Sequence, residues 1–423
     1  MFPTKLNLLA QMRAALTDQQ LALLRDISNL AVENGEELWI VGGFVRDLVL
    51  GGAGREVDLV VEGDAIGLAQ AVAAQCGGRV TPHRRFGTAK WRLPPDLGTA
   101  CGWSDLDFVM ARSEVYARPA ALPAVTRAAI REDMQRRDFT INTLALCLDG
   151  ERAGEVLDFY AGRVDLDERL IRVLHPRSFE DDPTRMFRAV RFAVRLNCAL
   201  EPATRQLIAP AHAHIAALSS ERLRRELQLV FEERRAAEIL IQLNDLGLLS
   251  AIHPVLANTA DAWLADKLAV AETGAEAADV SWLLWLFRVP ADAAQAVAQR
   301  LRLPVRLTAA LREAQQLGAD PGLRRELKAS ALVALLAGIH DSALAVLDIA
   351  AQDEGVRHNV RRYRSELRHI KPLVTGKVLR ARGMAAGPRY SKVLGRLRDA
   401  WLDGEICDAA GELALLDFFL SQS

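Results

Sequence analysis

The chain has 423 residues, which is too long for one ordinary hydrophobic core and predicts two to four domains. Half of the residues are apolar and a quarter are charged, and no apolar run reaches the roughly 18 residues of a membrane span, so no membrane partner is expected. The net charge of −1 argues neither for nor against nucleic acid. Residues 1–34 lack a signal-peptide pattern, and a cytoplasmic location is therefore expected.

Up to about residue 150 the pattern predicts mixed α/β structure. Apolar spacing predicts helices over 21–32 and 66–75. Short apolar, β-branched runs predict strands over 38–41, 57–61, 88–93 and 106–110. Residues 144–148 fit either a last strand or the continuation of a helix. From Asp182 onward the spacing of Leu, Ala, Arg and Glu is almost entirely helical. This change of pattern predicts a mixed α/β head followed by an α-helical remainder.

Gly42 and Gly43 follow the first predicted strand, and Arg46 lies in the short helix after them. Glycines let the backbone approach a phosphate, and a helix N-terminus favours negative charge. Glu56 and Asp58 are two residues apart on the next predicted strand, so they point to one face and can hold Mg²⁺ ions. Two such ions assist phosphoryl transfer at the attacking and leaving oxygens. The alternative is a tight turn with surface acids.

Asp107 lies in another predicted strand and is a candidate third metal carboxylate. The alternative is an exposed strand acid. Asp105 points to the same face of that strand and competes for the role.

Arg137, Asp138 and Asn142 lie in the segment Arg-Arg-Asp-Phe-Thr-Ile-Asn at 136–142. Arginines suit a triphosphate, whereas Asp and Asn side chains hydrogen-bond a ribose hydroxyl. The alternative is a helix start that Asp138 caps.

Asp182, Pro183 and Arg185 begin the helical part of the chain. Pro183 fits the first helical position, and Asp182 fits the N-cap. A carboxylate and a guanidinium about one turn apart also resemble a Watson–Crick edge, which would select a base without a template. A basic stripe follows, suited to RNA phosphate or to salt bridges, at Arg188, Arg191 and Arg195.

Residues 357–398 contain 13 lysines and arginines against a single acid, Glu366. A basic segment in a nearly neutral protein fits a phosphate-binding surface, and it fits a solvated helical face equally well.

Together these segments resemble the class II tRNA nucleotidyltransferase and poly(A) polymerase family of the polymerase-beta-like superfamily. The resemblance covers roughly residues 38–249 and rests on segments in family order, among them VGGFVRDLVLG, VDLVVEGDA, HRRFGTAKW, DLDFVMARSEVY, RRDFTINTLA, FEDDPTRMFRAVRFAVRL and ERLRREL. It implies an α+β fold with a polymerase-beta-like nucleotidyltransferase head over 1–150. An all-α neck over 151–235 and a helical body and tail over 236–423 would follow. The neck would read the base, and the body and tail would bind tRNA.

The implied reaction is template-independent addition of CMP, AMP or both to the 3′ end of tRNA, from CTP and ATP, with Mg²⁺ as cofactor. Family members build the whole CCA end, only CC, or only the terminal A, and divided work implies a partner enzyme that completes the CCA end. The alternative within the family is a poly(A) polymerase that adds AMP to RNA 3′ ends. Outside it, a small-molecule nucleotidyltransferase and a non-catalytic RNA-binding relative remain open.

The resemblance also implies roles for individual residues. The catalytic residues would be Glu56, Asp58 and Asp107, of which Glu56 and Asp58 would bind metal. The nucleotide would be bound by Gly42, Gly43, Arg46, Arg137, Asp138, Asn142, Asp182, Arg185 and Arg188, with Asp182 and Arg185 paired to its base. Arg222 and Glu226 would brace the neck helices.

Two positions depart from the family pattern. The first metal carboxylate, usually aspartate, is Glu56, whose additional methylene displaces the ion unless the backbone adjusts. A usual glutamate is replaced by Asp181, whose role is open.

Overall fold

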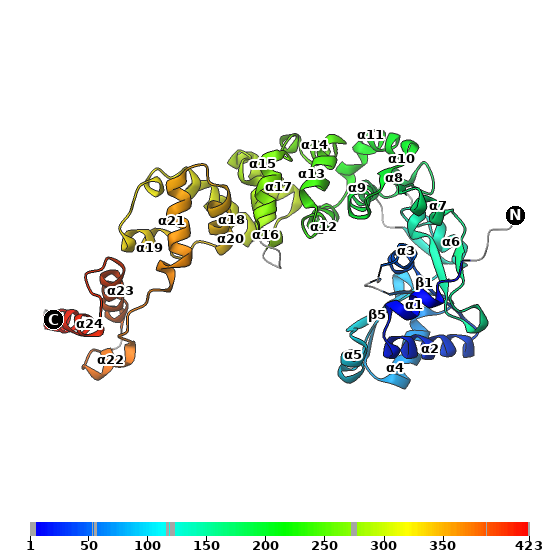
Figure 1. The fold of residues 1–423 in the computed structure, drawn as a ribbon, viewed down its shortest axis with the longest axis horizontal. Coiled ribbons are helices and arrows are strands. Elements are labelled where there is room, and N and C mark those ends of the chain that lie inside the picture. Colours follow the sequence, from blue (N-terminus) through cyan, green and yellow to red (C-terminus); the bar gives the residue numbers. More distant parts are fainter. Residues whose placement is uncertain are drawn as a thin grey trace. The chain divides into compact units, whose positions relative to one another are not determined.

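The computed structural model describes residues 6–52, 54, 57–115, 118, 123–271, 277–385 and 387–421. Its contacts divide the chain into two compact units. The first comprises Met1–Glu226 with Gln242–Ile252, and the second comprises Leu227–Ile241 with His253–Ser423. All the strands within the described residues lie in the first unit, whereas the second is built from helices (Figure 1). A mixed head followed by a helical remainder confirms the fold class predicted from the sequence.

A seven-stranded sheet forms the core of the first unit, in the order β3-β4-β5-β2-β1-β8-β9. Strands β2 and β5 pair in parallel, and the other neighbouring pairs are antiparallel. The strands are β1 (Glu37–Val41), β2 (Asp58–Glu62), β3 (Arg79–His83), β4 (Thr88–Arg92), β5 (Asp105–Met110), β8 (Leu144–Cys147) and β9 (Val156–Asp158). Shorter pairs are made by β6 (Arg112–Val115) with β7 (Ala124–Arg127), and by β10 (Leu170–Ile171) with β11 (Ala199–Leu200).

Different helices cover the two faces of the sheet. On one face, α2 (Asp18–Glu33) packs against β1, and α4 (Ala65–Cys76) packs against β4 and β5. On the other face, Trp39, Val41 and Val60 form an apolar cluster with Ile130 and Met134 of α6 (Ile130–Gln135). Because strand side chains alternate, Asp58 shares the face of Val60 and lies at the end of this cluster.

The predicted elements agree with the observed ones to within a few residues. Segment 144–148, left open between strand and helix, is strand β8. The sequence pattern missed β3, whose residues are mostly exposed and include Pro82. An exposed edge strand needs no apolar alternation, so its sequence carries no strand signal.

Short helices connect the strands of the first unit and continue beyond them. They are α1 (Leu9–Ala15), α3 (Gly43–Val49), α5 (Pro95–Cys101), α7 (Gly162–Asp167), α8 (Ser178–Asp181), α9 (Thr184–Leu196), α10 (Pro202–Gln206), α11 (Ile208–Ala211), α12 (Ser220–Phe231), α13 (Ala236–Asp245) and α14 (Leu248–Ile252). Helix α12 runs across the boundary between the two units, and so does α13.

In the second unit, helices α16, α18 and α20 pack against one another, and the buried rings of Trp282 and Trp285 contact the Phe231 ring. The helices are α15 (Ala262–Val270), α16 (Ala277–Phe287), α17 (Ala291–Leu301), α18 (Val305–Ala319), α19 (Ala329–Leu336), α20 (Asp341–Ala350), α21 (Glu354–Ser365), α22 (Gly376–Ala381), α23 (Pro388–Leu402) and α24 (Ala409–Ser421). Within the described residues no single helix has the length and apolarity to cross a membrane. Helices α19 and α20 meet that test only jointly, across a bend of 119°.

Candidate active site

Two carboxylates lie side by side where β2 and β5 begin. Asp58 and Asp107 are register partners in this parallel pair, so their side chains point to the same face of the sheet. Asp58 is exposed, and the Asp107 side chain is 46% exposed. Glu56, the other predicted metal ligand, lies outside the described residues. Within those residues no group of three or more His, Cys, Asp or Glu is placed to hold a metal ion. Two adjacent, accessible carboxylates nevertheless suit a hard divalent cation.

Gly42 brings the backbone close to this pair of acids. Its φ of +73° lies in the region that favours glycine, and it is the N-cap of α3. A Cβ at this position would lie 3.0 Å from Nη1 of Arg137 and 4.0 Å from Oδ2 of Asp58. A side chain would therefore push against the guanidinium beside Asp58. Gly43 is the first residue of α3, where a Cβ would lie 3.5 Å from Nη2 of Arg46.

A cleft of about 400 Å³ opens beside Asp58. Its walls come from parts of the chain that are far apart in sequence: strands β2, β4, β5 and β6, the segment after α6, and residues 182–188 around the start of α9. Six of the predicted site residues line it together: Asp58, Arg137, Asp138, Asp182, Arg185 and Arg188. Gly42, Gly43, Arg46, Asp107 and Asn142 are not among the lining residues.

An ion pair between Asp138 and Arg188 forms the buried side of the cleft. Oδ2 of Asp138 accepts hydrogen bonds from Nε (2.9 Å) and Nη2 (2.5 Å) of Arg188. Its Oδ1 accepts from the Asn142 amide and from the Phe139 backbone N–H, each at 2.9 Å. Burial disfavours the charged carboxylate, but Arg188, Asn142 and Arg185 outweigh it and lower the pKa of Asp138 to about 2. Asp138 is therefore ionised at neutral pH.

Asp182 and Arg185 are both held in place by hydrogen bonds. Oδ1 of Asp182 accepts from the Thr184 backbone N–H (3.0 Å), from the Thr184 hydroxyl (2.6 Å) and from Nη2 of Arg222 (2.5 Å). Arg185 donates to the hydroxyl of Ser178 (2.8 Å) and to the carbonyl of Arg136 (2.6 Å). Helix α9 begins at Thr184 with Pro183 as its N-cap residue, so the expected start at Pro183 was one position early. Asp182 still caps the helix start through its side chain.

Arg46 does not line the cleft and is almost fully buried. Its Nε and Nη2 donate to Oδ1 of Asp47 at 2.8 and 2.7 Å, and its Nη1 donates to Oδ1 of Asn142 at 2.9 Å. The guanidinium also stacks over the Phe192 ring, 5.4 Å from its centroid. The predicted contact of Arg46 with phosphate would require an exchange of these partners, and that contact stays a prediction.

Sequence reasoning missed the acids that hold the arginines of the cleft. The buried Asp133 accepts from Arg136 (2.6 Å) and from Arg137 (3.2 Å), and Glu114 accepts from Arg136 (3.0 Å) and from Arg112 (2.9 Å). Asp133 precedes the two arginines by three and four residues, and this helical spacing was an available signal. Glu114 lies in the β6 strand, and its proximity depends on the fold.

The two residues expected to brace the neck helices, Arg222 and Glu226, lie near Asp182 and Arg188. Arg222 bonds Asp182, as described above. Glu226 is buried, and burial raises its pKa despite the opposing charges of Arg188 and Arg191. Arg222 thus acts on the residue that follows α8, and Glu226 acts on arginines of α9.

The basic segment 357–398 is partly neutralised by acids that lie outside it. Asp348 pairs with Arg361 and Arg364, and Asp341 pairs with Arg368. Within the described residues of this segment, the exposed cations that form no ion pair are Lys371, Lys377, Arg380, Arg389 and Lys392. Much of the segment is therefore a salt-bridged helical face.

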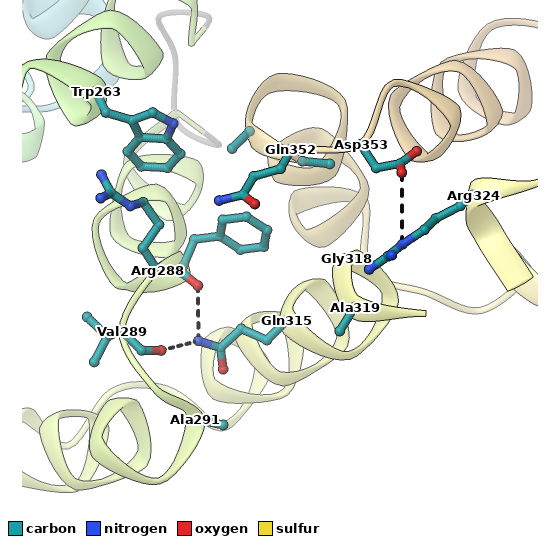
Figure 2. A pocket seen from close by; sticks show the side chains of 13 residues that line it. Trp263, Arg288, Val289, Ala291, Gln315, Gly318, Ala319, Arg324, Gln352 and Asp353 are labelled. Atoms are coloured by element: carbon teal, nitrogen blue, oxygen red, sulfur yellow. Dashed lines mark hydrogen bonds and ion pairs between the residues drawn. The ribbon is translucent and has the colours of Figure 1, made fainter. Parts of the chain in front are cut away.

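A larger cavity, of about 710 Å³, lies in the second unit between Trp263 and Asp353 (Figure 2). The Trp263 ring stacks on Arg288, and Gln315 donates to the carbonyl of Val289 at 2.7 Å. None of the predicted site residues lines it. We therefore place the candidate active site in the smaller cleft, where the acids and arginines converge.

Comparison with known proteins gives two family matches and a series of relatives. Residues 38–172 match the poly(A) polymerase head domain, and residues 197–259 match a probable RNA and SrmB-binding site of polymerase A. The chain is 34% identical over 416 residues to an A-adding tRNA nucleotidyltransferase of Geobacter sulfurreducens, an alignment that covers 93% of this chain and 46% of the relative. A CC-adding tRNA nucleotidyltransferase of Deinococcus radiodurans is 36% identical over 237 residues, which cover 56% of this chain and 61% of the relative. The chain spans about half the length of the curated relatives it matches.

Solved structures give the same picture of the fold. A CCA-adding enzyme superposes with a TM-score of 0.76 at 24% identity over 99% of this chain and 100% of that chain, a likeness that concerns the fold alone. A tRNA-processing enzyme superposes with a TM-score of 0.68 at 27% identity, covering 89% of this chain and all of that chain. Taken with the cleft, these similarities and the two domain matches place residues 38–172 and 197–259 in the tRNA nucleotidyltransferase and poly(A) polymerase family.

Proposed function

We propose that the chain adds CMP, AMP or both to the 3′ end of tRNA without a template, from CTP and ATP, with release of pyrophosphate. The observation that carries this proposal is the cleft, in which an acid of the sheet faces the carboxylates and guanidiniums of the Asp138 and Asp182 segments. Acids suited to a metal thus lie beside groups suited to a triphosphate and a base. The names of the Geobacter and Deinococcus relatives support tRNA as the acceptor.

In this proposal the chemistry is divided among residues that line the cleft and residues close to it. Asp58 and Asp107 would hold Mg²⁺, together with Glu56. When bound, Mg²⁺ neutralises charge on the triphosphate and on the reacting oxygens. Arg137, Arg188, Gly42 and Gly43 would position the phosphates, with Arg46 and Asn142 behind them. Asp138 would hold Arg188 and contact the sugar. Positioning and charge neutralisation then supply the rate enhancement, with no covalent enzyme intermediate.

Base selection is assigned to Asp182 and Arg185. Their side chains are already fixed by Thr184, Arg222 and Ser178, so they would present one set of donors and acceptors to the incoming base. We place this function in a neck over 151–235, between a catalytic head over 1–150 and a tRNA-binding body and tail over 236–423. An enzyme that matures tRNA acts where tRNA is used, and we propose a cytoplasmic location.

Among the possible products, terminal A addition has the most support, because the relative aligned over 93% of the chain is named A-adding. In that case a partner enzyme would first add CC. The alternative is a poly(A) polymerase that adds AMP to RNA 3′ ends, for which the head-domain match is the supporting observation.

The deciding experiment is incorporation of labelled CTP and ATP, separately and together, into tRNA transcripts. The transcripts end at the discriminator base, at C or at CC. One A added only to the CC end identifies an A-adding enzyme, growth to CCA identifies a complete one, and a stop at CC identifies a CC-adding one. Long A tails would move the chain to the poly(A) polymerases. Absence of any Mg²⁺-dependent incorporation, with well-folded protein, would overturn the proposal.

A further inference from the structure

Lys90 lies in one row with the two carboxylates of the candidate active site. It is the register partner of Asp107 across β4 and β5, and Asp107 is in turn the partner of Asp58 across β5 and β2. Register partners in adjacent strands point to the same face of a sheet. The ammonium of Lys90 and both carboxylates therefore lie on the face on which the cleft opens.

The ammonium is shared between two acids. Nζ of Lys90 lies 2.7 Å from Oδ1 of Asp105 and 2.9 Å from Oδ2 of Asp107. Asp105 also accepts a hydrogen bond from the hydroxyl of Ser104 at 2.6 Å. With two carboxylates within hydrogen-bond distance, the ammonium of Lys90 supplies the positive charge between them.

We propose that Lys90 is an internal counter-cation that competes with the divalent cation for Asp107. Before a nucleotide and its metal ion bind, the ammonium bridges Asp105 and Asp107. When a divalent cation is held by Asp58 and Asp107, Lys90 gives up Asp107 and keeps Asp105. The side chain of Lys90 is 43% exposed and that of Asp107 46%, so this exchange needs no repacking of the core. Lys90 is then a positioning residue that weakens metal binding in the absence of nucleotide.

This inference rests on the proposed function, which assigns Asp107 as a metal ligand. Its test measures metal binding, whereas the proposed function is tested by nucleotide incorporation. Mn²⁺ binding to the full chain, without nucleotide or RNA, is measured by electron paramagnetic resonance of the free ion at fixed ionic strength. Removing one positive charge beside a divalent cation in a water-like dielectric changes the affinity by about tenfold. Lys90→Met should therefore bind Mn²⁺ about tenfold more tightly than the unchanged chain. Lys90→Arg, which keeps the charge, should bind Mn²⁺ with an affinity close to that of the unchanged chain.

Two controls separate competition from other effects. Lys377→Met removes an exposed lysine charge in the second unit and should leave Mn²⁺ affinity unchanged. In an Asp107→Asn background, Lys90→Met should lose most of its gain, because the carboxylate that it uncovers is absent. Equal or weaker Mn²⁺ binding by folded Lys90→Met would overturn the inference, and so would an undiminished gain in the Asp107→Asn background. Nucleotide incorporation tests the proposed function separately, so the two can fail independently.

Discussion

Replacing Arg188 by Met removes the charge that balances the buried Asp138. The pKa of Asp138 is lowered from an ordinary 3.8 to about 2. At about 1.4 kcal/mol per pKa unit, that difference corresponds to roughly 2 kcal/mol of stability at neutral pH. Because the folded-state pKa is the lower one, this contribution is present above pH 3.8 and is lost as the pH falls through about 2. In Arg188→Met, burial dominates instead, so the pKa of Asp138 should rise above its ordinary value.

The expected loss of stability at pH 7 is about 3 to 5 kcal/mol, the usual result of leaving one member of a buried ion pair alone. At pH 4 Asp138 stays ionised in the unchanged chain but becomes largely protonated in the variant. The deficit should therefore shrink by about 1 kcal/mol or more between pH 7 and pH 4. The double change of Asp138→Asn with Arg188→Met removes the stranded charge and should recover part of the loss at pH 7.

The assay is hydrogen exchange of backbone amides in α9 peptides, measured against the unchanged chain at each pH. A local probe is needed because two compact units can unfold separately, which makes a single global midpoint ambiguous. An equal deficit at pH 7 and pH 4 would show that lost packing, not a stranded charge, causes the effect. A double variant that is no more stable than Arg188→Met would contradict the reasoning in the same way.

Further substitutions test other parts of the molecule. Asp58→Ala should lower nucleotide incorporation by at least a hundredfold, because one of the proposed metal carboxylates is lost. Retention of tRNA in a filter assay should stay within about twofold, because the proposed RNA-binding surface is intact. Unchanged turnover would remove Asp58 from the site. Gly42→Ala should lower the free energy of unfolding, measured in urea, by about 1 to 3 kcal/mol and should impair catalysis. Gly35 has a similar φ of +71° and open space around it, so Gly35→Ala should show only the backbone strain, with normal catalysis. Equal catalytic loss in both variants would argue against the close approach to Arg137. Glu412 is buried and accepts hydrogen bonds from two backbone N–H groups and an indole N–H. Glu412→Ala should therefore speed amide hydrogen exchange in α22 and α23 by the equivalent of about 2 to 3 kcal/mol, whereas a change at the exposed Glu405, Glu405→Ala, should not. Equal protection from exchange in the two variants would show that Glu412 does not stabilise these helices.

The sequence by itself determined several elements of the head and six of the residues that line the candidate site. Short apolar, β-branched runs located the strands that become β1, β2, β4 and β5. Gly42 was informative because its backbone conformation, with φ of +73°, favours glycine. These signals are local, because each depends on a spacing of a few residues along one strand or turn.

Only the tertiary structure decided which distant residues meet. Asp58 lies beside Asp107 because β2 and β5 pair in parallel, and no local pattern specifies the register of two strands. The same register brings Lys90 against Asp107, and the packing of α9 brings Arg188 onto Asp138. Arg46 illustrates the opposite outcome, since the sequence placed it in a phosphate motif and the fold buries it against Asp47 and Asn142. Side chains that meet across strands and helices are fixed by packing in three dimensions, which the periodicity of one segment does not contain.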